Sequence, residues 1–186
     1  MRLNAPRIAP MTDAEMDADQ KELLVPMGGR VLNIFRTLVR APKALRGFLG
    51  WGNYVLSRRN DLPAREREIV ILRVGFLCKS GYEFTQHTRI GLNEGLSADE
   101  IERIKRGAGA GWSAADAVLI KAADELHADQ FITDATWAEL GRHYSEKQCM
   151  DVVFTVGQYT QVSMMLNTFG VQLDAGQTLD PELKGF

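Results

Sequence analysis

The spacing of apolar residues along the chain follows the period of an α-helix from one end to the other. No stretch gives the alternation of apolar and polar residues between turn signals that a half-buried strand requires. Residues 63–77 have a strongly apolar centre, with Ile69, Val70, Ile71 and Leu72 in succession. The pattern therefore predicts an all-α protein.

Helix-capping signals divide this pattern into segments. Ser, Thr or Asp stands before several apolar runs, often with an acidic residue three positions later, which is the order of a capping box. Glycine and proline mark the breaks between runs. We predict about eight helices, two of them central and antiparallel and separated by a break at Lys79-Ser80-Gly81. The candidate segments number nine: a short helix after Thr12-Asp13-Ala14-Glu15, residues 32–39, 42–57, 63–77 and 82–94, a short helix after Ser97, residues 113–128, a helix capped by Asp134 to residue 144, and a helix capped by Ser145 to residue 171.

The organisation predicted from this reading is one domain over residues 1–186. Its core runs from about residue 30 to residue 171, and the N-terminal segment is peripheral. The tail 172–186 contains Gly and Pro, and we expect it to lie on the surface or to reach a neighbouring subunit.

Composition narrows the class of protein. The 22 Lys and Arg residues are balanced by 24 Asp and Glu residues, without a basic block, so nucleic acid is not an expected partner. The apolar runs are far shorter than the roughly 20 residues that cross a bilayer, and the first residues lack a continuous apolar signal segment. We therefore expect a cytoplasmic protein that does not associate with membranes. The two cysteines, Cys78 and Cys149, exclude a disulfide framework.

Polar residues suited to proton transfer gather around the break between the two central helices. Ser80, Glu83 and His87 are spaced by three and four residues, so on one helix they share a face. Glu68 precedes Ser80 by twelve residues on the preceding helix. If the break folds one helix against the other, a carboxylate and an imidazole converge, which is the minimum set for moving a proton.

The same region resembles the central motif of the carboxymuconolactone decarboxylase family, within the alkylhydroperoxidase D (AhpD) superfamily. The resemblance is carried by the runs 62–74 and 80–87, with moderate support from 35–42, from 157–159 and from Asn167, so it covers about residues 30 to 170. It implies an AhpD-like helical bundle that assembles into trimers or hexamers, with the pocket near subunit interfaces.

In the alkylhydroperoxidase D branch, a Glu is followed by two cysteines and a His. In this chain the Glu is Glu68, the cysteine positions hold Ser80 and Glu83, and the His is His87. A dithiol peroxidase needs one thiolate to attack peroxide and a second thiol to resolve the product. Serine and glutamate supply neither, so that activity is disfavoured.

The run Tyr82-Glu83-Phe84-Thr85-Gln86-His87 is more similar to the decarboxylase-like members. The resemblance implies a decarboxylase or related lyase that acts on a small organic acid or lactone without a metal or organic cofactor. His87, with Glu83 or Glu68, is the candidate for proton transfer, because imidazole titrates near neutral pH and a buried carboxyl can be tuned toward it. Which of the two acids takes part is left open.

Other residues are candidates for holding the substrate. Arg73 or Arg89 could orient a carboxylate through a bidentate contact. Ser80, at a helix N-terminus, could donate to a developing oxyanion. Tyr159 and Cys78 are further candidates for the pocket lining. No H-x-x-x-H or H-x-H pair supports a metal site.

Each of these residues also has a purely structural interpretation. Glu83 and His87 can form a simple intrahelical pair, Glu68 can anchor two helices, and Ser80 can act only as an N-cap. Cys78 can be a small core residue. Two alternative functions therefore stay open: a peroxidase-related protein that uses Cys78 alone, and a non-catalytic binding module on the same fold.

Overall fold

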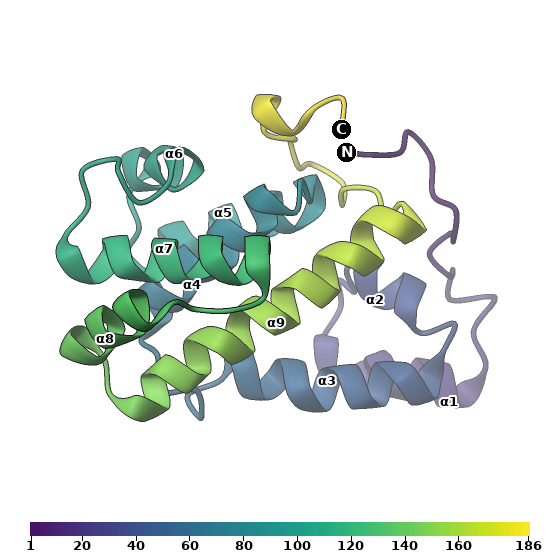
Figure 1. Ribbon diagram of the computed structural model, residues 1–186. Coiled ribbons are helices and arrows are strands. Elements are labelled where there is room, and N and C mark those ends of the chain that lie inside the picture. Colours follow the sequence, from purple (N-terminus) through teal and green to yellow (C-terminus); the bar gives the residue numbers. More distant parts are fainter.

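The computed structural model describes residues 1–186 and contains nine α-helices, two short 3-10 helices and no strand (Figure 1). The all-α prediction is confirmed. None of the helices combines the length and apolar character that crossing a bilayer requires. The elements are α1 (Ala18–Leu24), η1 (Val25–Met27), α2 (Asn33–Leu38), α3 (Pro42–Leu56), α4 (Ala64–Leu77), α5 (Gly81–Asn93), α6 (Ala98–Arg106), α7 (Ala114–Asp129), α8 (Asp134–His143), α9 (Glu146–Phe169) and η2 (Pro181–Leu183).

Helix α4 lies at the centre of the bundle. It packs against α5, α7 and α9, and its residues from Arg67 to Gly75 are all buried. A helix that is buried on all sides must be apolar all round, which explains the Ile69–Leu72 run. The three polar residues within the buried stretch are Arg67, Glu68 and Arg73, and each contacts a specific partner.

Helices α4 and α5 form an antiparallel hairpin, as predicted. Gly75 near the end of α4 faces Glu83 near the start of α5, whereas Glu68, earlier in α4, meets residues later in α5. The turn between the helices is tight, because Lys79 adopts a left-handed conformation (φ 54°) and the Ser80 N–H donates to the Gly75 carbonyl. Two positions nineteen residues apart in sequence thereby become neighbours.

Most predicted helix starts are confirmed, with two shifts. Ser97 and Ser145 both form capping boxes. The first helix, however, starts at Ala18 after a capping box of Asp17 and Gln20, because Glu15 accepts from both the N–H and the hydroxyl of Thr12, which leaves Thr12 in a turn. The predicted cap at Asp134 is also wrong, since the side chain of the preceding Thr133 accepts the N–H that the cap must satisfy.

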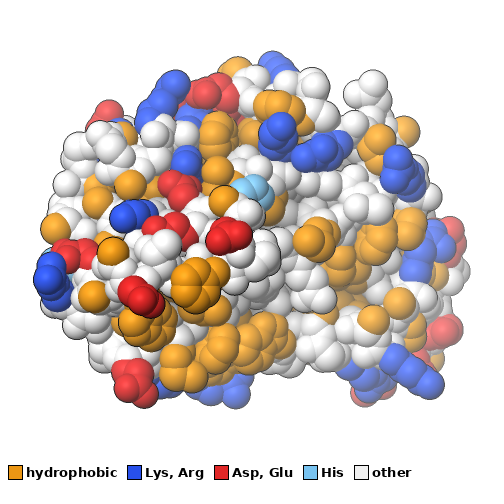
Figure 2. Space-filling model, viewed as in Figure 1, with side chains coloured by type: hydrophobic (Ala, Val, Ile, Leu, Met, Phe, Trp, Pro, Cys, Tyr) orange, Lys and Arg blue, Asp and Glu red, His pale blue; other side chains and the backbone are white.

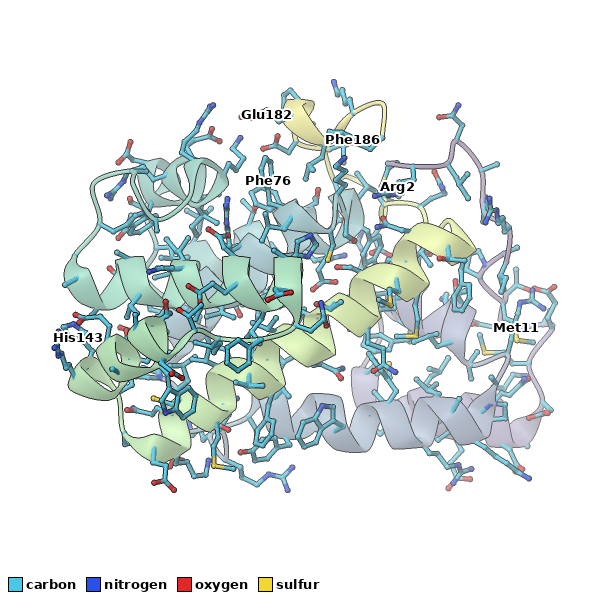
Figure 3. The ribbon with its side chains drawn as sticks, viewed as in Figure 1. Arg2, Met11, Phe76, His143, Glu182 and Phe186 are labelled. Carbon is cyan, nitrogen blue, oxygen red and sulfur yellow. The ribbon has the colours of Figure 1, made fainter.

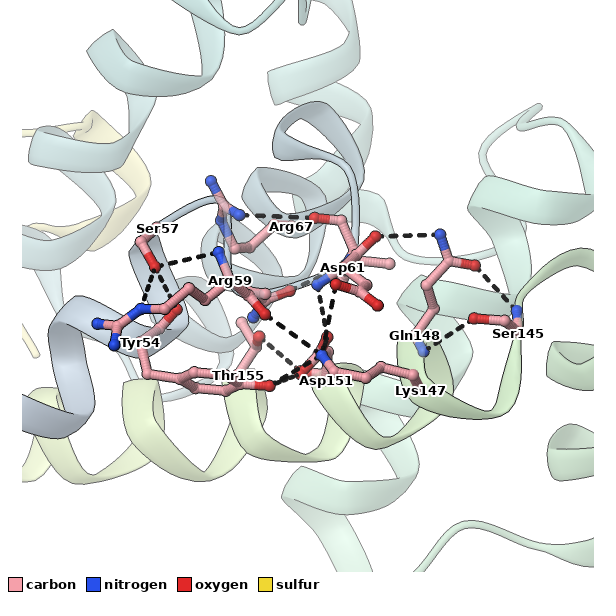
Figure 4. A network of polar contacts seen from close by, with 12 residues as sticks. Tyr54, Ser57, Arg59, Asp61, Arg67, Ser145, Lys147, Gln148, Asp151 and Thr155 are labelled. Carbon is pink, nitrogen blue, oxygen red and sulfur yellow. Dashed lines mark hydrogen bonds and ion pairs between the residues drawn. The ribbon is translucent and has the colours of Figure 1, made fainter.

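The loop before α4 is fastened to α9 by a buried carboxylate (Figure 4). Asp151 is fully buried and accepts from the Tyr54 hydroxyl at 2.6 Å, from the Asp61 N–H at 2.7 Å and from the Lys147 ammonium at 3.0 Å. Burial opposes ionisation, but these donors hold the pKa of Asp151 below its usual value. The contacts join the end of α3, the loop and α9, and so fix where α4 begins.

The C-terminal tail is mostly exposed or half-buried, but two of its residues, Asp174 and Leu183, are buried anchors. It folds back on its own chain beside the N-terminus (Figures 1 and 3), where the Met1 amino group donates to the Leu183 carbonyl at 2.8 Å. The Leu183 side chain is 1% exposed and belongs to the main apolar core. The tail carries apolar and acidic anchors, and the partners of the acidic ones lie on α2, α5 and α6.

Asp174 is the strongest of these anchors. Its carboxylate accepts from the Tyr82 hydroxyl and from the Gln86 amide, both at 2.7 Å, and from the Asn33 N–H at 2.9 Å. The side chain is buried and has no cationic partner, so three neutral donors satisfy it. Asp174 thus connects the tail to α2 and α5.

We predict that Asp174→Ala lowers the free energy of unfolding by about 2–4 kcal/mol, because three buried donors lose a charged acceptor. Urea unfolding followed by circular dichroism measures the change. Asp13→Ala is the control, since the Asp13 side chain is 82% exposed and pairs only with Arg36. Equal stability of the two variants would contradict the role given to Asp174.

Candidate active site

An apolar cavity of about 270 Å³ lies between α2 and α3 on one side and α5 and α9 on the other. Its size suits a small organic molecule. Aliphatic and aromatic side chains supply most of its wall, and a few polar groups interrupt it. The apolar lining includes Leu32, Ile34, Phe35, Phe48, Leu49, Ile90 and Val162, and the polar lining includes Asn53, Glu83, Gln86, His87, Gln158 and Tyr159.

His87 is held between two carboxylates at the wall of this cavity. Its Nδ1 lies 2.7 Å from Glu68 Oε2, and its Nε2 lies 2.9 Å from Glu83 Oε1. All three side chains are buried. The Tyr159 ring meets the imidazole edge to face, with ring centroids 4.9 Å apart. The predicted convergence of His87 with both acids is therefore observed.

The two carboxylates have different access to the cavity. Glu83 and His87 both line it, whereas Glu68 reaches His87 from α4 and is 1% exposed. Glu68 therefore contacts the imidazole from the side away from the cavity, whereas Glu83 borders the cavity itself.

A close approach of α4 and α5 makes the Glu68 contact possible. Gly91 lies one helical turn after His87, so both face α4. A Cβ at position 91 would stand 2.9 Å from Leu96 Cδ1, 3.3 Å from Leu72 Cδ1 and 3.7 Å from Glu68 Cβ. Glycine at this position lets the helices pack closely enough for the imidazole to reach Glu68.

The charges of the two acids control the ionisation of His87. Burial alone lowers the pKa of an imidazole, but Glu68 and Glu83 outweigh it and raise the pKa of His87 from 6.5 to about 10. At neutral pH the cluster thus holds an imidazolium between two carboxylates. The pKa of Tyr159 is raised by its burial and by the negative charges of Glu83 and Glu68, so its phenol stays protonated.

Arg89 stands at the mouth of the cavity. It is exposed, it forms no ion pair, and it lines both the cavity and an adjoining depression of about 620 Å³. Arg30 and residues 174–177 of the tail form other walls of that depression. An unpaired guanidinium at the mouth is suited to an anionic group of a ligand.

Besides Glu68, three predicted site residues lie outside this cavity, and two of them, Arg73 and Ser80, are buried. Arg73 is buried and points away from the cavity, where it pairs with Asp124 and donates to the carbonyls of Ile104 and Lys105 at the end of α6. Ser80 is fully buried, its hydroxyl has no partner, and it does not line the cavity. Ser80 occupies the N-cap of α5 without a side-chain capping bond. The shared helix face was not enough to bring Ser80 to the cavity, because Ser80 precedes His87 by about 10 Å along the helix axis.

Cys78 belongs to a separate groove of about 640 Å³, which it lines together with His127 and the basic residues Arg2, Arg7 and Lys79. Lys and Arg side chains gather at the upper right of the face in Figure 2, the region where Figure 3 labels Arg2. The Cys78 sulfur lies 3.7 Å from His127 Nδ1. Burial raises the pKa of the Cys78 thiol, and Cys149 is a second, separate free thiol.

The arrangement around His87 differs from a metal site. Glu68 and Glu83 bind opposite nitrogens of the ring, so the three side chains do not converge on one point as metal ligands do. No cluster of three or more His, Cys, Asp or Glu side chains in the chain has the geometry to hold a metal ion.

Sequence reasoning missed several residues of the cavity. Gln158, Asn53 and Gln86 line it but were given no role. Gln86 lies within the central motif, and Gln158 lies beside Tyr159 in the flanking run, so their positions in the motif were the available signal. Asn53 on α3 carries no such signal, because only the packing of α3 against α9 brings it to the cavity.

Comparison with known proteins agrees with the fold. The model of the carboxymuconolactone decarboxylase family matches residues 42–125, which include α4, α5 and the Glu68, Glu83 and His87 cluster. No curated protein sequence matches the chain. Several solved structures share the fold at 12–18% sequence identity.

An uncharacterized peroxidase-related protein from Ralstonia eutropha JMP134, with an alkylhydroperoxidase AhpD core, is similar with a TM-score of 0.78 and 17% identity, over 90% of this chain and 93% of that one. An uncharacterized peroxidase-related protein from Silicibacter sp. TM1040 is similar with a TM-score of 0.72 and 18% identity, over 99% of this chain and 94% of that one. A variant of the debrominase Bmp8 in complex with 2,3,4-tribromopyrrole is similar with a TM-score of 0.74 and 12% identity, over 90% of this chain and 91% of that one. The chain resembles the carboxymuconolactone decarboxylase family over residues 42–125, and its fold is that of AhpD-like proteins.

The raised pKa of His87 predicts how stability depends on pH. The folded protein keeps a proton on His87 that the unfolded chain loses above pH 6.5, so this contribution is complete below pH 6.5 and is lost as pH rises through about 10. Between about pH 8 and about pH 9.5, the unfolding free energy of the wild type should fall as pH rises. Its slope should be steeper than that of His87→Gln by up to about 1.4 kcal/mol per pH unit.

Urea unfolding over this pH range measures the two slopes. His143→Gln is the matched control, because His143 is exposed and contacts only Glu139 and the neighbouring Tyr144 ring. It should keep the wild-type slope. A His87→Gln slope equal to that of the wild type would show that His87 carries no extra proton in the folded state.

Proposed function

We propose that this protein is an enzyme that carries out acid–base chemistry on a small organic acid or lactone, of decarboxylase or related lyase type, without a cofactor. One observation carries the proposal: a buried carboxylate, Glu83, opens onto an apolar cavity and is hydrogen-bonded to an imidazolium that a second acid holds from behind. Such a cluster stores a proton in a water-poor site, where proton transfer to carbon is favoured.

Glu83 is the group proposed to contact the substrate. A proton that moves from His87 Nε2 to Glu83 Oε1 makes Glu83 a neutral acid, and Glu83 then delivers this proton to the substrate carbon. Glu68 acts as a positioning residue, because its bond to Nδ1 fixes the ring and stabilises its charge. The proposal thus assigns the acid role to Glu83 and not to Glu68.

In a decarboxylation, the bond between the substrate carbon and its carboxylate breaks, and its electron pair moves into the conjugated carbonyl of the lactone. Carbon dioxide leaves, and the proton from Glu83 reaches the carbon. Water then returns a proton to the cluster. Arg89 at the mouth is placed to hold an anionic group of the substrate as it binds.

The superfamily supports small-molecule chemistry on this fold. A debrominase of similar structure was solved with 2,3,4-tribromopyrrole, a small ring compound. A cavity of about 270 Å³ here has room for a ring of that size.

The single-cysteine alternative has less support. Cys78 lies in another groove, and its raised pKa leaves it as the unreactive thiol at neutral pH. A purely structural role for the cluster is also less favoured, since a buried triad that only held two helices together would have no reason to border a cavity.

We further propose that the protein self-associates, as the resemblance to trimeric or hexameric proteins implies. Figure 2 shows apolar side chains gathering along the lower part of one face, and the exposed apolar residues include Trp51, Met150 and Val153.

Substitution of the two acids tests the proposed roles. With carboxymuconolactone as substrate and carbon dioxide release as the readout, Glu83→Gln should lower kcat by about 10²–10⁴, the usual contribution of a general acid. Glu68→Gln should retain more activity and shift the pH profile, because His87 loses one charged partner. Full activity of Glu83→Gln would contradict the proposal.

Substitution of the thiol separates the alternatives. Cys78→Ser should keep kcat and KM within about twofold of the wild type, since the Cys78 groove does not include the His87 cluster. Steady-state kinetics and treatment with a thiol alkylating agent both measure this. Loss of activity in either experiment would instead favour the single-cysteine reaction.

A further inference from the structure

The amide of Gln158 is an unpaired polar group in the wall of the cavity. The side chain lies on α9 beside Tyr159, is 4% exposed, and lines the cavity from the side facing α3. Its carbonyl oxygen is buried and has no hydrogen-bond partner.

Leaving such a group unpaired is costly. An unsatisfied buried amide oxygen costs about 1–3 kcal/mol, and buried polar groups without a partner are rare in folded proteins. The amide stands against α3, where a Cβ at Gly52 would lie 3.5 Å from its nitrogen. Rotation by half a turn about the last side-chain bond exchanges its oxygen and nitrogen, so an acceptor can be offered to the cavity.

Four other polar groups around this cavity already have partners. Tyr82 and Gln86 both donate to Asp174, and Glu83 and His87 contact each other. Gln158 therefore adds an uncommitted amide to the cavity wall, separate from the charged cluster of Glu83 and His87.

We propose that the Gln158 carbonyl accepts a hydrogen bond from an N–H or O–H group on the substrate, and so selects small ring acids that carry such a donor. The proposal rests on the proposed function, because it places the donor in the same cavity as Glu83. The substrate then has three recognised parts: an anionic group toward Arg89, a reacting carbon toward Glu83, and a donor toward Gln158.

Two ring acids of nearly equal shape test this specificity. Pyrrole-2-carboxylate carries a ring N–H, whereas furan-2-carboxylate has an oxygen there and no donor. Isothermal titration calorimetry should show the wild type binding pyrrole-2-carboxylate at least about tenfold more tightly, since a site built to accept a hydrogen bond discriminates against a ligand that lacks the donor.

Gln158→Met keeps the length of the side chain and removes the acceptor. It should bring the affinity ratio of the two acids close to one. Gln161→Met is the matched control, because Gln161 lies one turn further along α9, is exposed, and does not line this cavity. It should keep the wild-type preference.

Several outcomes would overturn the proposal. These are equal binding of the two acids by the wild type, a preference that survives in Gln158→Met, or no binding of pyrrole-2-carboxylate at millimolar concentrations. Stability gives a second readout: removal of an unpaired buried amide should leave the thermal midpoint of the ligand-free protein unchanged or higher. A lower midpoint would show that the amide is paired within the chain.

Turnover by Glu83→Gln, measured beside the affinity ratio of the two acids, distinguishes this proposal from the proposed function. If the proposed function fails, Glu83→Gln keeps full turnover, whatever the ratio of affinities. If the role of Gln158 fails, the ratio is insensitive to Gln158→Met, whatever the effect of Glu83→Gln on turnover.

Discussion

The structure depends on one interaction: a buried imidazole between two carboxylates that come from different positions of one helical hairpin. Each of these charged groups alone would be unfavourable in an apolar interior, because an isolated buried charge is costly. Together they place an imidazolium in hydrogen-bonded contact with an acid at each nitrogen. The tight turn at Lys79 and the close helix approach at Gly91 are the backbone conditions that let this cluster form.

The cluster also explains why this fold can do without thiols. In this chain, Ser80 and Glu83 occupy the positions that resemble a redox cysteine pair, and the chemistry proposed for the site is transfer of a proton. Glu83 makes two contributions to the site, because it pairs with the charged His87 and also lines the cavity. The tail contributes indirectly, because Asp174 holds Tyr82 and Gln86 at the cavity wall.

Much of the fold could be predicted from the sequence, because local signals determine it. The serine caps at Ser97 and Ser145 and the apolar centre of α4 specify helices regardless of their surroundings. The meeting of Glu68 with His87 could be predicted only conditionally, since it needs the hairpin to close. Arg73 could not be placed, because an arginine that binds carbonyls at the end of α6 has the same sequence pattern as one that binds a ligand. The two buried anchors of the tail could not be predicted, because Asp174 and Leu183 find partners that are distant in sequence.

The central claim is that His87 is an imidazolium held by two acids, and NMR of its ring nitrogens tests this most directly. The account predicts that both nitrogens are protonated at neutral pH, that they stay so well above pH 6.5, and that Glu68→Gln lowers the midpoint of the titration. A ring with one protonated nitrogen at neutral pH, or a midpoint near 6.5 that Glu68→Gln does not change, would contradict it.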